Sequence, residues 1–333
     1  MKGLQPKDRD GAIEPGAALE RLLLGGPRRY TRQEVCDLAG VPLDEARRFW
    51  RALGFADVGD DERAFTDQDL AALTRLRDLL ASGTVDHGLA LRITRAFGHT
   101  MSRLGEWQIG EFADRLDGES GYDELERLLP ELEPLLLHTW RRQLAAATDR
   151  ALRWGADEEA AAQLVVGFAD LVGFTRLSRR LDAPELAELI ETFESRAADV
   201  VAELGGRVVK TVGDEVLFVA DTPSAGAEIA LALAEAMAVE EVVPELRVGV
   251  AFGTVLHRLG DVFGSTVNLA SRLTSLARPD TVLADRALAE SLAGDPAYDT
   301  RPIRRRPVRG LGIVEPRVLR RGGRFDRPIS LPM

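Results

Sequence analysis

The chain is poor in cysteine and lysine and has no long hydrophobic run, and each of these absences excludes a class of protein. Its one cysteine, Cys36, cannot form an intrachain disulfide, so a disulfide-stapled secreted domain is excluded. The N-terminus, MKGLQPKDRDG, lacks the apolar segment of a secretory signal. The richest apolar stretch, from Ile229 to Val243, contains three glutamates, so no membrane span is expected. Together these absences predict a cytoplasmic protein.

Basic residues do not outnumber acidic ones in either half of the chain. Residues 1–160 carry 22 Lys and Arg against 30 Asp and Glu, and residues 161–333 carry 21 against 24. A protein that binds the phosphate backbone of nucleic acid needs a basic surface, so nucleic acid is not expected as a partner. Only 3 of the 43 basic residues are lysines, and Lys210 is the one that lies far from the N-terminus.

A length of 333 residues indicates two domains, because a single hydrophobic core stops growing near about 250–300 residues. We expect a helical domain over residues 1–155, with loosely ordered residues up to about 25 and a linker at 154–157. Capping residues and apolar periodicity predict helices over 31–40, 42–54, 66–80, 86–104, 107–117, 122–137 and 139–154.

The second half changes to mixed α and β structure. Apolar runs predict strands over 163–168, 207–210, 215–220, 246–252 and 281–284, and amphipathic stretches predict helices over 183–204, 225–238 and 266–277. The simplest layered arrangement is a sheet of antiparallel strands with helices on one side. We expect this second domain to span 156–321, with a frayed end from about 320 and a flexible tail over 322–333.

Two aspartates in this half are candidates for metal binding. Asp170 closes an apolar strand, and Asp214 lies at the tip of a predicted hairpin after Gly213. If the two strands are neighbours, the carboxylates converge, and such a pair suits Mg²⁺ or Mn²⁺ rather than zinc. Taken singly, an aspartate beside a glycine turn is more often a turn residue.

Two further segments have the residue types that bind phosphates. The turn at Gly173, Phe174 and Thr175 leads into a helix, whose first backbone N–H groups can hold an anion. Asn268 and Arg272 lie four residues apart on one helix face, and a guanidinium offers paired donors to a phosphoryl group. An ordinary glycine turn and a solvated helix face are the alternative readings of these two segments.

The segments FADLVGFT (168–175), RVVKTVGDE (207–215) and GDVFGSTVNLASR (260–272), in this order and spacing, resemble the catalytic domain of class III nucleotide cyclases, the adenylate and guanylate cyclase family. The stretch GFTRLSRRLDAPELAELIETF (173–193) extends the resemblance, which covers residues 163 to about 319. The resemblance implies an α+β fold with a ferredoxin-like βαββαβ core. It also implies a head-to-tail homodimer with active sites at the interface, which converts a nucleoside triphosphate to its 3′,5′-cyclic monophosphate and pyrophosphate.

Position by position, the resemblance assigns a role to each candidate residue. It makes Asp170, Asp214 and the carbonyl of Leu171 ligands of two Mg²⁺ or Mn²⁺ ions. It makes Lys210 and Asp261 the pair that selects adenine, so that ATP is the expected substrate. It makes Asn268 and Arg272 the catalytic pair that orients the ribose and stabilises the transition state.

The first half carries a second, shorter resemblance. Residues 30–80, with YTRQEVCDLAG, VPLDEARRFWRALGF and FTDQDLAALTRLRDLL, resemble the helix-turn-helix of MerR-type regulators. The arrangement also resembles soluble actinobacterial adenylate cyclases whose N-terminal helical domain restrains the catalytic dimer, and this implies regulation. Cys36 is expected to be a buried apolar residue. The alternative function is a catalytically silent cyclase homologue with a DNA-binding or protein-binding N-terminal module.

Overall fold

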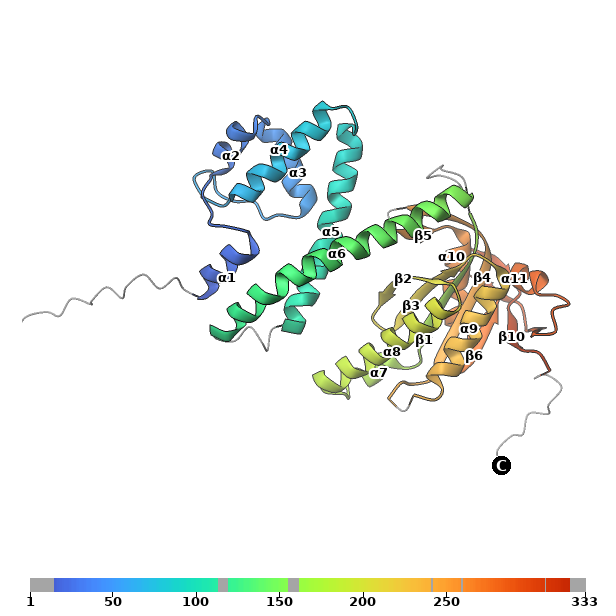
Figure 1. Cartoon of the computed structure of the whole chain (residues 1–333). Helices are drawn as coiled ribbons and strands as arrows, with labels where there is room; N and C mark the ends of the chain where they lie inside the picture. Colours follow the sequence, from blue (N-terminus) through green and yellow to red (C-terminus); the bar gives the residue numbers. More distant parts are fainter. Residues whose placement is uncertain are drawn as a thin grey trace, which may run out of the picture. The chain divides into compact units, whose positions relative to one another are not determined.

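The computed structural model describes residues 15–112, 119–154, 162–240, 242–258, 260–308 and 310–323. The chain divides into two compact units, residues 1–146 and 147–333 (Figure 1). The expected linker lies outside the described residues from residue 155 onward, and the expected flexible tail does so from residue 324 onward.

The described part of the N-terminal unit (residues 1–146) is built of helices, and one isolated β-bridge joins Tyr30 to Phe65. Its helices are α1 (Pro15–Leu23), α2 (Arg32–Ala39), α3 (Leu43–Leu53), α4 (Asp67–Ala81), α5 (His87–Phe112) and α6 (Glu119–Trp154), the last of which continues into the second unit. Among the described helices, none is long and apolar enough to cross a membrane.

The predicted capping residues start two of these helices. Thr31 forms a capping box with Glu34 at the start of α2, and Thr66 forms one with Asp69 at the start of α4. Helix α2 ends at Ala39 and is followed by Gly40, whose left-handed backbone (φ 68°) suits glycine. The helices enclose a small core that contains Cys36, which is 1% exposed, so its predicted burial is confirmed.

Three expectations for this unit were wrong. Helix α1 occupies part of the segment expected to be loosely ordered. A single helix α5 crosses the predicted break before residue 107, and α6 crosses the one at residue 138. Both breaks were inferred from interrupted apolar periodicity, but a helix tolerates a residue such as Gly105 at a cost of about 1 kcal/mol.

The C-terminal unit (residues 147–333) has the expected βαββαβ core with additions at its C-terminal side. The strands are β1 (Ala162–Leu171), β2 (Arg207–Val212), β3 (Glu215–Ala220), β4 (Leu246–Arg258), β5 (Asp261–Phe263), β6 (Thr281–Ala284), β7 (Tyr298–Pro302), β8 (Arg306–Val308), β9 (Gly312–Val314) and β10 (Arg317–Arg321). The helices are α7 (Phe174–Leu177), α8 (Ala183–Glu203), α9 (Pro223–Met237), α10 (Ser265–Leu276) and α11 (Arg286–Ser291).

The main sheet has the strand order β2-β3-β1-β4-β6-β10-β7, with β5 paired to β4. Strand β1 is central and antiparallel to both β3 and β4, whereas β6 is parallel to β4. The order β2-β3-β1-β4 of the first four strands, joined by α8 and α9, is the ferredoxin-like arrangement. The predicted α+β fold class, with an all-helical first half, is therefore confirmed.

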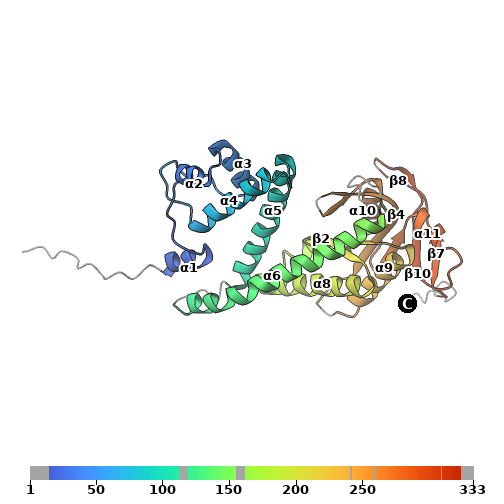
Figure 2. The same cartoon turned by 45° about the horizontal axis from the view of Figure 1, so that its top comes forward.

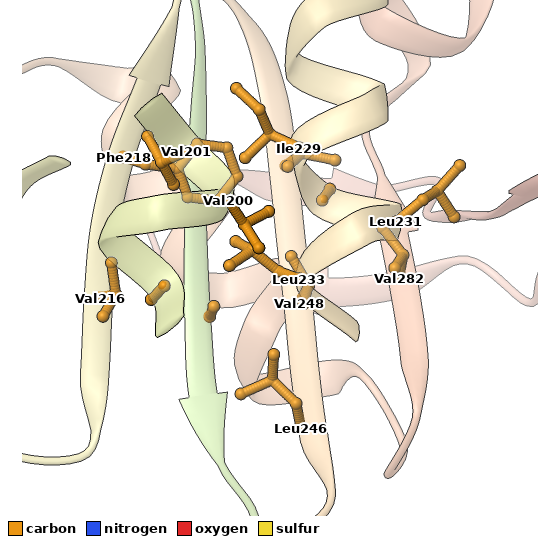
Figure 3. Close-up of a cluster of buried hydrophobic side chains, with 14 of the residues drawn as sticks. Val200, Val201, Val216, Phe218, Ile229, Leu231, Leu233, Leu246, Val248 and Val282 are labelled. Atoms are coloured by element: carbon orange, nitrogen blue, oxygen red, sulfur yellow. The ribbon is translucent and has the colours of Figure 1, made fainter. Parts of the chain in front are cut away.

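Helices cover both faces of the sheet, so the expectation of helices on one side was wrong. On one face, α8 and α9 pack over β1, β3 and β4, where Phe218, Ile229 and Leu233 belong to the larger core cluster (Figure 3). Figure 2 shows α9 lying along the sheet. On the other face, α10 packs against β1 and β4 with Ala270 and Leu273 fully buried. Successive side chains of a strand point to opposite faces of the sheet. Strand β1 has apolar side chains on both faces, so it is buried on both.

The chain does not fray at residue 320 as expected, because Arg320 and Arg321 belong to β10. Arg321 forms ion pairs with Glu228 and Glu235 of α9, at 2.7 and 3.0 Å. These ion pairs connect β10 to the helix that covers the sheet. Strand pairing with β6 and β7 holds the backbone of β10 in place.

Candidate active site

Strand pairing brings the two candidate metal aspartates together. Asp170 lies one residue before the end of β1, opposite Glu215 of β3, and Asp214 lies in the turn of the β2–β3 hairpin. The amide of Leu171 donates to the carbonyl of Asp214 at 3.0 Å. Gly213 adopts a left-handed backbone (φ 62°) that lets this hairpin turn tightly. The Leu171 side chain is buried in the core, so only its backbone faces this end of the strands.

Arg247 and Glu215 belong to the same cluster and were not singled out in the sequence. Arg247 of β4 lies opposite Asp170 in the register, and its Nε donates to Oδ2 of Asp170 at 2.5 Å. A signal for both was present, since each is a charged residue at the start of an apolar strand. Register across strands decides whether such a charge meets another one, and a single sequence does not show that register.

The electrostatics of this cluster favour binding of a cation. Burial raises the pKa of Asp170, the ion pair with Arg247 opposes the rise, and the nearby Asp214 adds to it. Burial also raises the pKa of Glu215, with further contributions from Asp170 and Asp214. Three carboxylates at one strand end therefore repel one another, and only one of them has a guanidinium partner in the described structure.

The candidate adenine-selecting residues form a direct pair. Nζ of Lys210 on β2 donates to Oδ2 of Asp261 on β5 at 2.5 Å, although 51 residues separate them. Burial acts to raise the pKa of Asp261, but the hydrogen bonds from Lys210 and from the Val262 amide outweigh it, and the pKa is lowered. Both side chains are partly exposed, at 43% and 28%, so a ligand can reach them.

Asn268 and Arg272 lie on the exposed side of α10, and the opposite side of the helix is held tightly to the sheet. Oγ1 of Thr274 donates to the carbonyl of Phe168 on β1, at 3.3 Å, and Oγ1 of Thr266 donates to that of Thr254 on β4, at 2.8 Å. Gly249 of β4 lies directly beneath this helix, where a Cβ atom would come within 2.2 Å of the Thr274 amide.

The candidate phosphate-binding turn follows β1 directly. Gly173 has a left-handed backbone (φ 75°) and precedes the short helix α7. The Phe174 side chain packs against the larger core cluster, so its backbone amide rather than its ring remains available to a ligand. Thr175 is exposed. The first amides of a helix have no acceptor within it, which leaves those of Phe174 and Thr175 for an anion.

The described structure thus brings the predicted residues into separate groups. Asp170 and Asp214 form one group with Arg247, and Lys210 and Asp261 form another; α10 carries Asn268 and Arg272. Among the described residues, no hydrogen bond or ion pair joins the first group to either of the others. In the same residues, no three side chains of the His, Cys, Asp and Glu types converge as metal ligands.

An α+β sheet domain with paired carboxylates at one strand end is a candidate metal-dependent enzyme, and comparison with known proteins identifies its family. The model of the adenylate and guanylate cyclase catalytic domain matches residues 157–319. The chain belongs to the adenylate and guanylate cyclase family, so this resemblance and the prediction of an enzyme are confirmed.

Relatives resemble the chain over almost its whole length. An adenylate cyclase of Streptomyces coelicolor is 47% identical over 94% of this chain and 95% of the relative. An adenylate cyclase of Streptomyces griseus is 45% identical over 96% and 92%, respectively. The crystal structure of the adenylyl cyclase CyaB from P. aeruginosa is similar to 52% of this chain and 98% of that one, with 23% identity and a TM-score of 0.45.

Proposed function

We propose that the chain converts ATP to 3′,5′-cyclic AMP and pyrophosphate. The observation that carries the proposal is the direct pair between Lys210 and Asp261, in a chain whose relatives over most of its length are named adenylate cyclases. In this reaction the ribose 3′-oxygen forms a bond to the α-phosphorus, the bond to pyrophosphate breaks, and the hydroxyl proton is released.

The Lys210–Asp261 pair suits adenine by its donor and acceptor types. The lysine ammonium only donates and matches the acceptor N1 of adenine, while the aspartate only accepts and matches the 6-amino group. Guanine presents an N–H at N1 and an oxygen at position 6. Each contact would then set donor against donor or acceptor against acceptor, so GTP should be a poor substrate.

The carboxylates of Asp170 and Asp214 and the carbonyl of Leu171 fit two Mg²⁺ or Mn²⁺ ions. All three are hard oxygen donors, and Asp170 already attracts the cationic Arg247 in this structure. When bound, the ions supply activation of the 3′-hydroxyl and neutralise charge on the leaving pyrophosphate. Because no three His, Cys, Asp or Glu side chains of the described residues converge as metal ligands, substrate phosphates and water are expected to fill the remaining positions.

Three other parts of the chain are proposed to act on the substrate. The amides of Phe174 and Thr175, after Gly173, hold a phosphate group at the start of α7. Asn268 orients the ribose, and Arg272 one turn later donates to the charge that develops on the α-phosphoryl oxygens. The anchoring of α10 by Thr266 and Thr274 fixes the direction of both.

A head-to-tail homodimer is proposed to complete the site. Within the described part of one chain, no hydrogen bond or ion pair connects the Asp170 group with the Lys210–Asp261 pair or with α10. In a two-fold dimer, the metal group of one copy faces the adenine-selecting pair and α10 of the other. Each dimer then has two equivalent sites.

Regulation by the N-terminal unit is proposed because every residue with an assigned chemical role lies between Asp170 and Arg272. We propose residues 1–155 as the regulatory domain and 156–321 as the catalytic domain. The relatives cover both parts, which supports a role of the helical part in the enzyme rather than in DNA binding. The cytoplasmic location stays a prediction of the sequence.

The proposal is tested by incubating the purified full chain with ATP and Mn²⁺ and measuring cyclic AMP and pyrophosphate. We expect equal amounts of both products, and a loss of about 100-fold or more in Asp214→Asn. Asp199→Asn, which changes an exposed carboxylate on α8, is the matched control and should keep wild-type turnover. Absence of product from the wild-type chain refutes the function, and equal losses in the two variants refute the role of Asp214.

A further inference from the structure

A cavity in the N-terminal unit has no place in the proposed chemistry. Its volume is about 490 Å³, and its lining comes from the segment between α1 and α2, from α2 and α3, from the loop between α3 and α4, and from the first turn of α4. Ligand sites in proteins typically have about 300–1,000 Å³ and combine apolar walls with a few polar groups. This cavity has that size, and its lining contains both apolar and charged side chains.

The apolar part of the lining is aromatic. Trp50 and Phe65 stack on each other with ring centroids 4.5 Å apart and an angle of 30° between their planes. Phe55 lies at the cavity with 52% of its surface exposed. An exposed phenyl ring next to a stacked pair offers a flat surface to another ring, because aromatic rings gain from offset or edge contacts.

The polar part of the lining is rich in arginine, with Arg28, Arg32, Arg47 and Arg51 around the cavity. Arg28 pairs with Glu20, and Arg47 lies 3.7 Å from both Asp44 and Asp60. Arg51 forms no ion pair within the described residues. Its exposed guanidinium is therefore available to an anion.

Arg32 provides a second observation, because its guanidinium pairs with Asp60 and Asp57 while one of its buried N–H groups is left without a partner among the described residues. Only 8% of this residue is exposed, and its Nη1 donates to the carbonyl of Val58 at 2.9 Å. Its Nε has no hydrogen-bond partner in the described part of the protein, which is unfavourable for a buried N–H group. A small shift of the side chain on ligand binding would give this donor an acceptor.

The lining holds four arginines against three carboxylates, and each of these carboxylates has a hydrogen-bond or ion-pair partner. Asp69 accepts from the amide and hydroxyl of Thr66 at 2.7 and 2.9 Å, and Glu62 accepts from the amide of Gly59 at 3.1 Å. Asp57 lies 3.4 Å from Arg32. We propose that this cavity binds a small organic anion with a planar aromatic ring, with the anionic group on Arg51 and the ring against Trp50 and Phe55.

The probe is anilinonaphthalene sulfonate, added to the full chain and followed by calorimetry. Arg51→Gln should weaken binding at least about tenfold, because it removes a charge-assisted hydrogen bond. Arg48→Gln is the matched control, since Arg48 is exposed on the same helix but does not line the cavity. Circular dichroism of both variants checks that they are folded. Equal affinities of the two variants overturn the proposal.

The place and the chemistry of binding are tested separately. The chain has four tryptophans, so labelled indole N–H groups give four signals, of which Trp50→Phe identifies one. The probe should shift the Trp50 signal at the lowest concentrations, and a first shift at any of the other three signals overturns the proposed place. Phenylnaphthylamine, which lacks the charge, and octanesulfonate, which lacks the ring, should both bind more weakly. Equal binding of either compound overturns the corresponding half of the proposed ligand chemistry.

Discussion

Replacing Gly249 by alanine should displace helix α10, and with it Asn268 and Arg272. The added Cβ atom would lie 2.2 Å from the Thr274 amide nitrogen and 2.6 Å from the carbonyl oxygen of Ala270. Ordinary van der Waals contact begins at 3.4 Å. The helix therefore has to move by about 1 Å, because both obstructing atoms belong to its backbone.

The size of the effect follows from this displacement. Overpacking of this kind costs about 1–3 kcal/mol of stability, so the variant should still fold. A misplacement of about 1 Å at reacting groups lowers turnover by about 100-fold. We therefore expect a modest fall in the melting temperature of Gly249→Ala and a large fall in kcat.

The assay compares kcat for cyclic AMP formation with thermal unfolding of the same preparation. Gly105→Ala is the control, because no atom lies within 4 Å of a Cβ added at Gly105 and alanine is the better helix former. It should keep kcat and raise stability by about 0.5–1 kcal/mol. If Gly249→Ala keeps the kcat of the wild-type chain, the account of how α10 is positioned is refuted.

Three further predictions concern the purine contacts, the single thiol and a buried carboxylate. GTP should be turned over at least about tenfold more slowly than ATP, as mismatched polar groups cost about 1–3 kcal/mol each; equal kcat/KM values for the two nucleotides would show that Lys210 and Asp261 are wrongly assigned. Burial raises the pKa of Cys36 to about 11, so at pH 8 only about one thiol in a thousand is ionised. An aromatic disulfide reagent should then react slowly with the native chain at pH 8 and faster as the pH rises. In denaturant, the thiol should react at once. Rapid reaction of the native chain at pH 8 would contradict the burial of Cys36. Asp285 is 5% exposed and accepts from the amides of Phe252, Ala287 and Leu288. Asp285→Ala should therefore lower the free energy of unfolding in urea by about 2–4 kcal/mol. An unchanged midpoint of urea unfolding would show that these hydrogen bonds do not stabilise the fold.

Local signals in the sequence predicted local structure well. The capping boxes of Thr31 and Thr66 start helices α2 and α4 as expected, and the hairpin around Gly213 was placed correctly. These features depend on residues only a few positions apart. The family's segments also located the candidate site residues, although their roles stay proposals.

Features that depend on distant partners were missed. Arg247 meets Asp170 only because β4 pairs with β1 in one particular register, and nothing near Arg247 in the chain specifies it. Strand β10 was missed because its order comes from β6, β7 and the ion pairs of Arg321 with α9. The position of α10 on the opposite face from α8 was missed for the same reason, since apolar periodicity does not tell which face of a sheet a helix covers.

The central claim is that each catalytic site combines two half-sites from two copies of the chain. It is tested most directly by mixing Asp170→Ala and Arg272→Ala chains after dissociation and measuring cyclic AMP formation. Each homodimer lacks one essential residue in both sites and should be almost inactive. A heterodimer has one intact site, so an equal mixture should regain about a quarter of wild-type activity. A mixture that exchanges subunits and stays as inactive as its parents would contradict the claim.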